Sequence, residues 1–300
     1  MADRRDVEYF SGGARIRGWL TLPDGAGPHA GVVFCPGYSG TRYAAFYQPY
    51  IDGLVGMGIA VLLSDYRGWG DSEGERGIID PRLQLDDLRA ALTYLETRPE
   101  VARDRLGLIG VSYGGGHATA LNALDGRVRT AVAISAVGDG VAFLKSMRRE
   151  YEWYEFLDGL AEERRRVVLG AEPALVHPNE DIQIATPERR ATTARGQVDP
   201  AKTPDRTPLL CADAILDYSP RRYAFEARRM LWICVEQDAV VPSDQSREMY
   251  ALASAPKRLV VVPGRGHYAA YLGQFDVIWP ETKAWFETHL GPPAPVAQGG

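Results

Sequence analysis

The chain has 300 residues, of which 45% are hydrophobic and 24% charged, and its formal net charge is −5. This composition is typical of a globular protein, and the acidic balance argues against nucleic acid or an anionic membrane as a partner. No apolar run approaches the roughly 20 residues that a membrane-spanning helix needs. The first ten residues lack the apolar core of a signal peptide, so we expect a cytoplasmic protein with no membrane partner.

The cysteines give no sign of a disulfide framework or a metal site. Cys35, Cys211 and Cys234 are far apart in the chain, and no two of them form a C-x-x-C pair. Reduced and buried thiols are therefore the expected state. No spacing typical of metal ligands occurs, and we expect neither a metal nor an organic cofactor.

Strand and helix signals alternate over the first 135 residues or so. The helix expected from residue 81 has a clear start, because Asp80 can cap it and Pro81 suits a first turn that needs no backbone donor. Alternation of this kind predicts an α/β fold with a mostly parallel sheet covered by helices on both faces. The expected strands lie within 7–22 and at 30–35, 59–64, 106–111 and 128–134, and the helices at 47–54, 81–95 and after 112.

The alternation of strand and helix signals is interrupted between residues 138 and 225. This stretch contains a charge-rich helical segment at 151–168 and a Pro/Thr/Arg-rich passage near 186–207. Strand signals resume at 230–235, followed by a helix near 246–253, a strand at 258–262 and a final helix over 280–290. We therefore predict a core formed by 1–137 and 226–290, an insertion at 138–225, and a disordered tail at 291–300.

The motif Gly110-Val111-Ser112-Tyr113-Gly114 joins a predicted strand to a predicted helix. A turn this tight forces its central residue toward strained backbone angles, and glycines on either side avoid collisions. The hydroxyl of Ser112 would then stand above the end of the sheet. A serine in this place is a candidate nucleophile, which needs a base and an acid to orient that base.

His267 is the candidate base, because it follows a buried strand in a Gly-rich loop at the end of the sheet where Ser112 is expected. Asp238 also follows a buried strand and is the candidate acid, with Glu236 as the alternative. The remaining histidines lie before a strand, on the helix after Ser112, in the insertion and at the end of the last helix (His29, His117, His177 and His289).

The order Ser112, Asp238, His267, each directly after a strand, resembles the nucleophile–acid–base order of the α/β-hydrolase superfamily. The segment Asp65-Tyr66-Arg67-Gly68-Trp69-Gly70-Asp71-Ser72 resembles the D-x-R-G-x-G-x-S loop of its esterase, dienelactone-hydrolase-like and X-prolyl-peptidase-like branches. The resemblance implies a doubly wound α/β-hydrolase sheet, with the insertion as a helical lid (cap). It also implies that Asp65, Arg67 and Asp71 are scaffold.

By the same resemblance, backbone N–H groups of Tyr113 and Tyr38 form the oxyanion hole. The Tyr38 side chain is a candidate for the substrate pocket, with simple packing as the alternative. Trp153 and Tyr154 of the insertion are further pocket candidates. The alternative for them is a small core of the insertion itself.

These residues predict a serine hydrolase that cleaves a carboxylic ester or related acyl bond through an acyl-enzyme intermediate. One alternative is a carbon–carbon bond hydrolase acting on a β-diketone or related ketone; an aminopeptidase, a thioesterase or an acyltransferase also fits. Another is a non-catalytic small-molecule binding protein. The expected partner is a small-molecule ester or ketone, with no nucleic acid, and the oligomeric state stays open, a homo-oligomer included.

Overall fold

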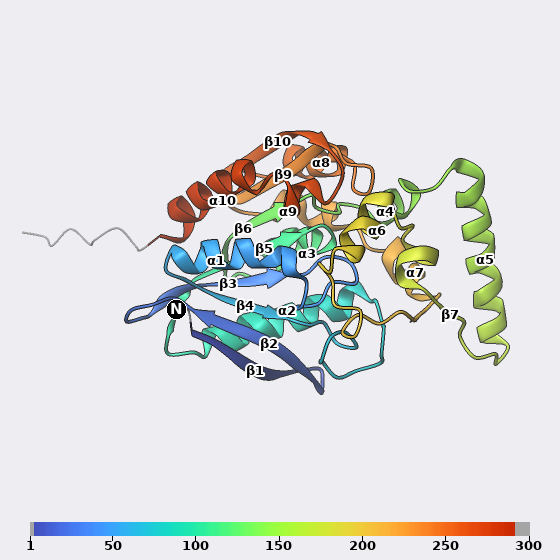
Figure 1. Ribbon diagram of the computed structural model, residues 1–300, viewed down its shortest axis with the longest axis horizontal. Coiled ribbons are helices and arrows are strands. Elements are labelled where there is room, and N and C mark those ends of the chain that lie inside the picture. Colours follow the sequence, from blue (N-terminus) through green and yellow to red (C-terminus); the bar gives the residue numbers. More distant parts are fainter. Residues whose placement is uncertain (1–2, 292–300) are drawn as a thin grey trace, which may run out of the picture.

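The computed structural model describes residues 3–291 of the chain. Within that range, eight strands form one sheet in the order β1-β2-β4-β3-β5-β6-β9-β10. Figure 1 shows helices on both faces of this sheet. The disordered tail predicted at 291–300 lies, apart from Gly291, outside the described residues.

From β4 to β10, neighbouring strands of this sheet are parallel, whereas β1 and β2 form an antiparallel hairpin that joins the sheet through β4. The mostly parallel α/β fold predicted from the sequence is therefore confirmed. The strands are β1 (Asp3–Ser11), β2 (Ala14–Leu22), β3 (His29–Cys35), β4 (Ile59–Ser64), β5 (Val101–Val111), β6 (Val128–Ile134), β9 (Met230–Gln237) and β10 (Lys257–Arg265).

Side chains of the central strands alternate between two hydrophobic clusters, one on each face of the sheet. In β3, Val33 and Cys35 belong to the first cluster and Val32 and Phe34 to the second, as the two-residue period of a strand requires. Helices α2 (Pro81–Glu96), α3 (Tyr113–Leu124) and α8 (Ser243–Leu252) contribute to the first cluster, and α1 (Gln48–Gly56) and α10 (Phe275–Leu290) to the second. A single turn, α9 (Ala269–Leu272), precedes α10.

The start of α2 agrees with the sequence-based prediction, whereas the start of α10 does not. Asp80 caps α2 as expected, since its carboxylate accepts a hydrogen bond from the N–H of Arg82 at 2.8 Å. Helix α10 begins earlier than the predicted residue 280, and Pro280 lies inside it. Pro280 removes one backbone hydrogen bond, but the helix continues through it because its apolar face, which includes Phe286, is buried against the sheet.

The segment that connects β6 to β9, residues 135–229, contains the insertion predicted at 138–225 and is called the insertion below; it lies at one end of the sheet, with α5 outermost (Figure 1). The charge-rich segment predicted at 151–168 forms α5 (Glu150–Val168). The other elements here are α4 (Gly140–Lys145), α6 (Pro187–Ala194), α7 (Cys211–Leu216), the paired two-residue strands β7 (Leu175–Val176) and β8 (Thr207–Pro208), and the turns η2 (Pro178–Ile182) and η3 (Pro220–Glu226). A further turn, η1 (Ala45–Tyr47), precedes α1.

A buried polar cluster joins the insertion to the core. The ring of His117, on α3, contacts the Tyr218 hydroxyl of the insertion through Nδ1 at 2.6 Å and Gln84 Oε1 of α2 through Nε2 at 3.0 Å. Because an amide oxygen only accepts, Nε2 carries the proton and Nδ1 accepts from Tyr218. Burial lowers the pKa of His117 to about 3, so the ring is neutral in the folded protein.

All three cysteines are unpaired and buried, as the sequence predicted. Burial raises the pKa of each thiol, that of Cys234 to about 11.

We expect His117 to make the folded protein sensitive to mild acid. In the unfolded chain the ring takes up a proton near pH 6.5, whereas in the folded protein it does so only near pH 3. Stability is therefore present above pH 6.5 and is lost as the pH falls through this window. Between pH 7.5 and 5 this ring should account for a loss of about 2 kcal/mol in the free energy of unfolding.

Urea denaturation across this pH range tests the expectation. The His117→Gln variant should lose less stability on acidification than the wild type, whereas His29→Gln should follow the wild type, since His29 is only partly buried. Parallel stability curves for His117→Gln and the wild type would contradict it.

Candidate active site

Ser112 occupies a strained turn between β5 and α3. Its φ of 55° and ψ of −120° lie where side chains other than glycine are uncommon. The turn is held by a hydrogen bond from the N–H of Ser112 to Ile134 O at 2.8 Å. The Ser112 side chain is thereby presented at the carboxyl end of the parallel strands.

Gly110 and Gly114, on either side of the serine turn, cannot be replaced by larger residues without a steric clash. A Cβ on Gly110 would lie 2.0 Å from the carbonyl oxygen of Gly114, and one on Gly114 would lie 2.1 Å from that of Cys35. These contacts are with backbone atoms, so no side-chain movement relieves them. The motif is therefore a place where strand β5, helix α3 and the end of β3 approach one another as closely as backbones can.

The structure brings Ser112, His267 and Asp238 together from three chain segments. Nε2 of His267 lies 2.9 Å from Ser112 Oγ, and Nδ1 lies 2.7 Å from Asp238 Oδ2. All three side chains are buried. Since a carboxylate only accepts, Nδ1 carries the proton and Nε2 is left to accept from the serine hydroxyl.

Asp238 is fixed in turn by its own backbone contacts. Its Oδ1 accepts hydrogen bonds from the N–H groups of Val240 and Val241, both at 2.9 Å, which leaves Oδ2 for His267. Glu236, the alternative acid, is exposed. The structure therefore pairs Asp238, rather than Glu236, with the histidine.

The backbone N–H groups of Tyr38 and Tyr113 have no hydrogen-bond acceptor within residues 3–291. Tyr113 is the first residue of α3, where the helix dipole favours negative charge. Tyr38 lies in the loop after β3, whose Gly37 packs against the Ser112 side chain. The N–H of Gly37 is already used, because it donates to the Tyr47 hydroxyl at 3.0 Å. In residues 3–291, the N–H groups of Tyr38 and Tyr113 are thus available as donors, and so is that of Gly114, which has no acceptor in this range either.

A small cavity of about 40 Å³ adjoins Ser112 and His267. Tyr38 lines it, and its hydroxyl donates to Pro178 O at 3.0 Å. Other lining side chains come from both the core and the insertion, among them Thr41, Tyr271, Gln183, Arg189 and Val198.

The structure corrects the placement of Trp153 and Tyr154, which do not line this cavity. Both lie on α5, at the outer end of the molecule (Figure 1). Trp153 stacks on Phe156 with ring centroids 5.9 Å apart, and Tyr154 is 56% exposed with its hydroxyl donating to Glu150. Trp153 therefore packs within the insertion, which was the alternative to a place in the substrate pocket.

Helix α6 of the insertion contacts the loop that carries His267. Glu188 Oε2 accepts a hydrogen bond from the His267 N–H at 2.8 Å, and Arg189 donates to the Tyr268 hydroxyl at 2.8 Å. The sequence analysis missed both residues, and no local pattern marks them. Their contacts span 79 residues of chain.

Tyr271 is a third residue that the sequence analysis missed. Its hydroxyl lies 3.3 Å from Nε2 of His267, and burial raises its pKa well above the usual range. The phenol therefore stays protonated and can donate toward the same nitrogen that faces Ser112. Its position four residues after His267 was the available signal, since residues four apart share one face of a helical turn.

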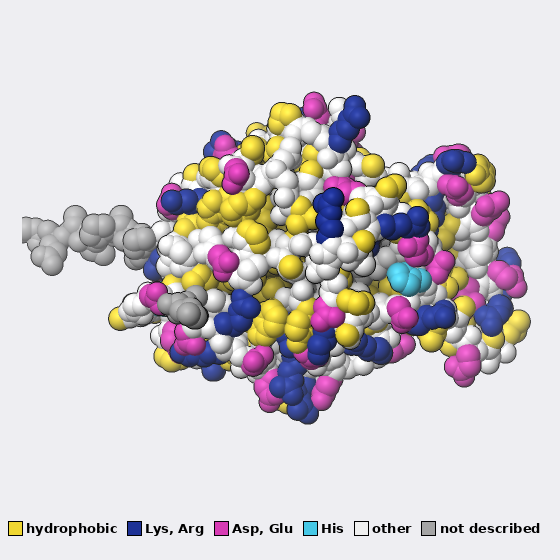
Figure 2. Space-filling view, viewed as in Figure 1, with side chains coloured by type: hydrophobic (Ala, Val, Ile, Leu, Met, Phe, Trp, Pro, Cys, Tyr) yellow, Lys and Arg dark blue, Asp and Glu magenta, His cyan; other side chains and the backbone are white. Residues whose placement is uncertain are grey.

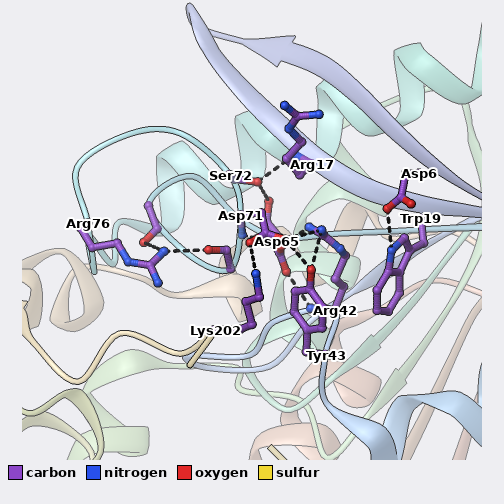
Figure 3. A network of polar contacts seen from close by, with 12 residues as sticks. Asp6, Arg17, Trp19, Arg42, Tyr43, Asp65, Asp71, Ser72, Arg76 and Lys202 are labelled. Carbon is purple, nitrogen blue, oxygen red and sulfur yellow. Dashed lines mark hydrogen bonds and ion pairs between the residues drawn. The ribbon is translucent and has the colours of Figure 1, made fainter. Parts of the chain in front are cut away.

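The segment 65–72 forms part of a polar network around Arg42 (Figure 3). Asp65 accepts hydrogen bonds from the N–H groups of Arg42, at 2.7 Å, and Asp71, at 3.0 Å, while the Arg42 guanidinium contacts both carboxylates. Burial raises the pKa of Asp65, and the Arg42 charge opposes that rise. A Cβ on Gly70 would lie 2.0 Å from the Asp65 carboxylate, which explains this glycine of the motif.

Asp71 links this network to the insertion, since Lys202 donates to it at 2.5 Å. Partial burial by itself raises the pKa of Asp71, but hydrogen bonds from Lys202 and Tyr43 lower it to about 2. Arg67 is engaged separately, in an ion pair with buried Asp87 at 2.6 Å. In the part of the chain that the structure describes, Asp65, Arg67 and Asp71 make no hydrogen bond or ion pair to Ser112, His267 or Asp238.

No group of three or more His, Cys, Asp or Glu side chains within residues 3–291 is arranged to hold a metal ion. No helix in that range is long and apolar enough to cross a membrane.

The sheet order and the strand–serine–helix turn define an α/β-hydrolase fold. The chain belongs to the Alpha/beta hydrolase family, whose sequence model matches residues 32–276. It is 28% identical over 272 residues to an uncharacterized 31.7 kDa protein in the traX-finO intergenic region of Escherichia coli, covering 90% of this chain and 94% of that one.

Two fungal relatives have names that state an activity. A thiohydrolase of Eupenicillium brefeldianum is 26% identical, covering 95% of this chain and 94% of the relative. A polyketide transferase of a Penicillium species, GrgF, is 26% identical, covering 96% and 97%. The crystal structure of α/β hydrolase GrgF superposes with a TM-score of 0.81 at 24% identity, covering 97% of this chain and 100% of that one.

Replacing Gly114 by alanine should destabilise the protein, because its Cβ would meet the backbone of Cys35 and Pro36. Overpacking of this kind costs about 1–3 kcal/mol in the free energy of unfolding. Gly126→Ala is the matched control, since nothing lies within 4 Å of its Cβ position. Equal unfolding midpoints in urea for the two variants would show that the turn tolerates a side chain at residue 114.

Proposed function

We propose that this protein is a serine hydrolase that cleaves an ester or thioester through an acyl-enzyme intermediate. The observation that carries the proposal is the continuous line of hydrogen bonds from Asp238 through His267 to Ser112. A binding protein needs no such line, and it needs no serine held in a strained turn. The geometry therefore supports catalysis over binding alone.

The proposed reaction begins with attack of Ser112 Oγ on the substrate carbonyl carbon, while His267 Nε2 takes the hydroxyl proton. Asp238 stabilises the imidazolium that forms. The N–H groups of Tyr38 and Tyr113 donate to the oxyanion. His267 then gives its proton to the leaving oxygen or sulfur, the carbon–oxygen or carbon–sulfur bond breaks, and the acyl group remains on Ser112.

Water, deprotonated by His267, then attacks the acyl carbon. The bond from that carbon to Ser112 Oγ breaks, His267 returns the proton to Oγ, and a carboxylic acid is released. The names of the relatives support this class of chemistry, because a thiohydrolase and a polyketide transferase can share the acyl-enzyme step. Hydrolysis and transfer then differ only in whether water or another nucleophile accepts the acyl group. An acyltransferase is therefore the second candidate, favoured by the relative named as a transferase.

Ser112→Ala should lower kcat by a factor of about 10⁴–10⁶ toward any substrate the wild type cleaves, because the variant cannot form the acyl-enzyme. The measurement is hydrolysis of 4-nitrophenyl esters of graded chain length and of matched N-acetylcysteamine thioesters. Thermal unfolding checks that the variant folds. Near-normal hydrolysis by the folded variant would refute the assignment of Ser112.

A fluorophosphonate probe separates the proposed enzyme from a binding protein. The wild type should be labelled at Ser112, as mass spectrometry of the tryptic peptide would show, and Ser112→Ala should not. A β-diketone in the same substrate panel tests the carbon–carbon hydrolase alternative, which requires cleavage of the diketone and not of the esters. Added small-molecule alcohols or thiols test transfer, through formation of a new ester or thioester.

A further inference from the structure

A groove of about 920 Å³ lies beside the cavity at Ser112. It is lined mainly by the insertion, from Leu175 to Arg206, together with Arg76 of the core. Arg189 and Val198 line both the groove and the cavity, so the two spaces meet at these side chains. The cavity alone is far too small for a substrate, whereas the groove has the volume of a typical ligand site.

The groove is electropositive although the whole chain has a net charge of −5. Four arginines line it, against the carboxylates of Glu180 and Asp205. Glu180 is engaged by one of them, Arg190, at 2.7 Å. Figure 2 shows Lys and Arg side chains interspersed with Asp and Glu side chains on the part of this face that the insertion forms.

The other three arginines make no ion pair within residues 3–291. Arg189 donates to the Tyr268 hydroxyl, Arg206 to the carbonyl oxygen of Leu175 at 3.2 Å, and Arg76 to that of Gly70 at 2.8 Å. All of these acceptors are neutral. Guanidinium groups that face a groove without a carboxylate partner favour an anionic ligand there, and they match carboxylate or phosphate geometry.

Two buried side-chain oxygens at the cavity also lack a hydrogen-bond partner. Oγ1 of Thr41 and Oε1 of Gln183 are buried there with no hydrogen-bond partner in the described part of the chain. Thr41 is 1% exposed and Gln183 is 5% exposed. Buried polar atoms are nearly always satisfied in native proteins, so these two require a hydrogen-bonding partner in the cavity, which a polar group of a ligand can supply.

We infer that the groove and the cavity together bind an acyl compound with a carboxylate or phosphate group, which Arg189 and Arg206 hold in the groove. The inference rests on the proposed function for the reaction at Ser112, and it adds the charge class of the substrate. Arg189 is the inner contact, because it also lines the cavity. Arg206 is the outer contact.

Matched substrate pairs test the inference, one for each place where the anion can sit. Mono-4-nitrophenyl glutarate against 4-nitrophenyl pentanoate places a carboxylate on the acyl side. Butyryl-coenzyme A against butyryl-N-acetylcysteamine places phosphates on the thiol side. In at least one pair the anionic member should have the higher kcat/KM, by about tenfold or more, as a charge-assisted hydrogen bond would produce.

The ratio of kcat/KM between the two members should fall about fivefold or more in Arg189→Gln and in Arg206→Gln, and less in Arg189→Lys, which keeps the charge. Arg195→Gln is the matched control, because Arg195 is exposed at the end of α6 and does not line the groove. If Arg189 had a purely structural role, its replacement would lower kcat/KM equally for both members of a pair and leave their ratio unchanged. Salt near 0.5 M should also reduce the ratio.

A binding measurement keeps the inference testable without turnover. Calorimetric titration of Ser112→Ala with monomethyl glutarate and dimethyl glutarate, and with coenzyme A, should show tighter binding of the anionic compounds, weakened by Arg206→Gln. Ratios near one in both substrate pairs, together with equal binding of the two glutarate esters and none of coenzyme A, would overturn the inference. Absence of hydrolysis and of fluorophosphonate labelling, with anion binding retained, would instead refute the proposed function alone.

Discussion

The lack of room at Gly110 and Gly114 is the constraint on which the rest of this structure depends. Backbone atoms of β5, α3 and the end of β3 meet there at distances that exclude any Cβ. Only this close approach lets α3 begin immediately after Ser112 and lets the loop with Tyr38 pack against the serine. The strain at Ser112 is sustained because the residues on either side, 106–111 of β5 and 113–122 of α3, are buried.

The insertion belongs to the site as much as the sheet does. Helix α6 holds the backbone of His267 through Glu188 and places Arg189 between the cavity and the groove. The polar network at Asp71 and the buried pair of His117 and Tyr218 tie the same insertion to the core elsewhere. The side chains around Ser112 thus come both from the loops at the end of the sheet and from the insertion, which are far apart in sequence.

The sequence was sufficient where the information is local. Apolar runs, the cap at Asp80 and the strand-end positions of Ser112, Asp238 and His267 all follow from residues within a few positions of one another. Contacts between residues far apart in the chain produce no local sequence pattern, so the positions of Glu188, Arg189 and Gln183 were not predicted. Trp153 and Tyr154 were assigned to the pocket on residue type alone, because nothing in the sequence says which way α5 faces.

One consequence follows from the contact between Glu188 and His267. The cavity at Ser112 has a volume of about 40 Å³, and its wall includes Arg189 of α6. The same short helix anchors the backbone of His267. A displacement of α6 that widened this cavity would also move Glu188, so the size of the cavity and the position of the His267 backbone are coupled through one short helix.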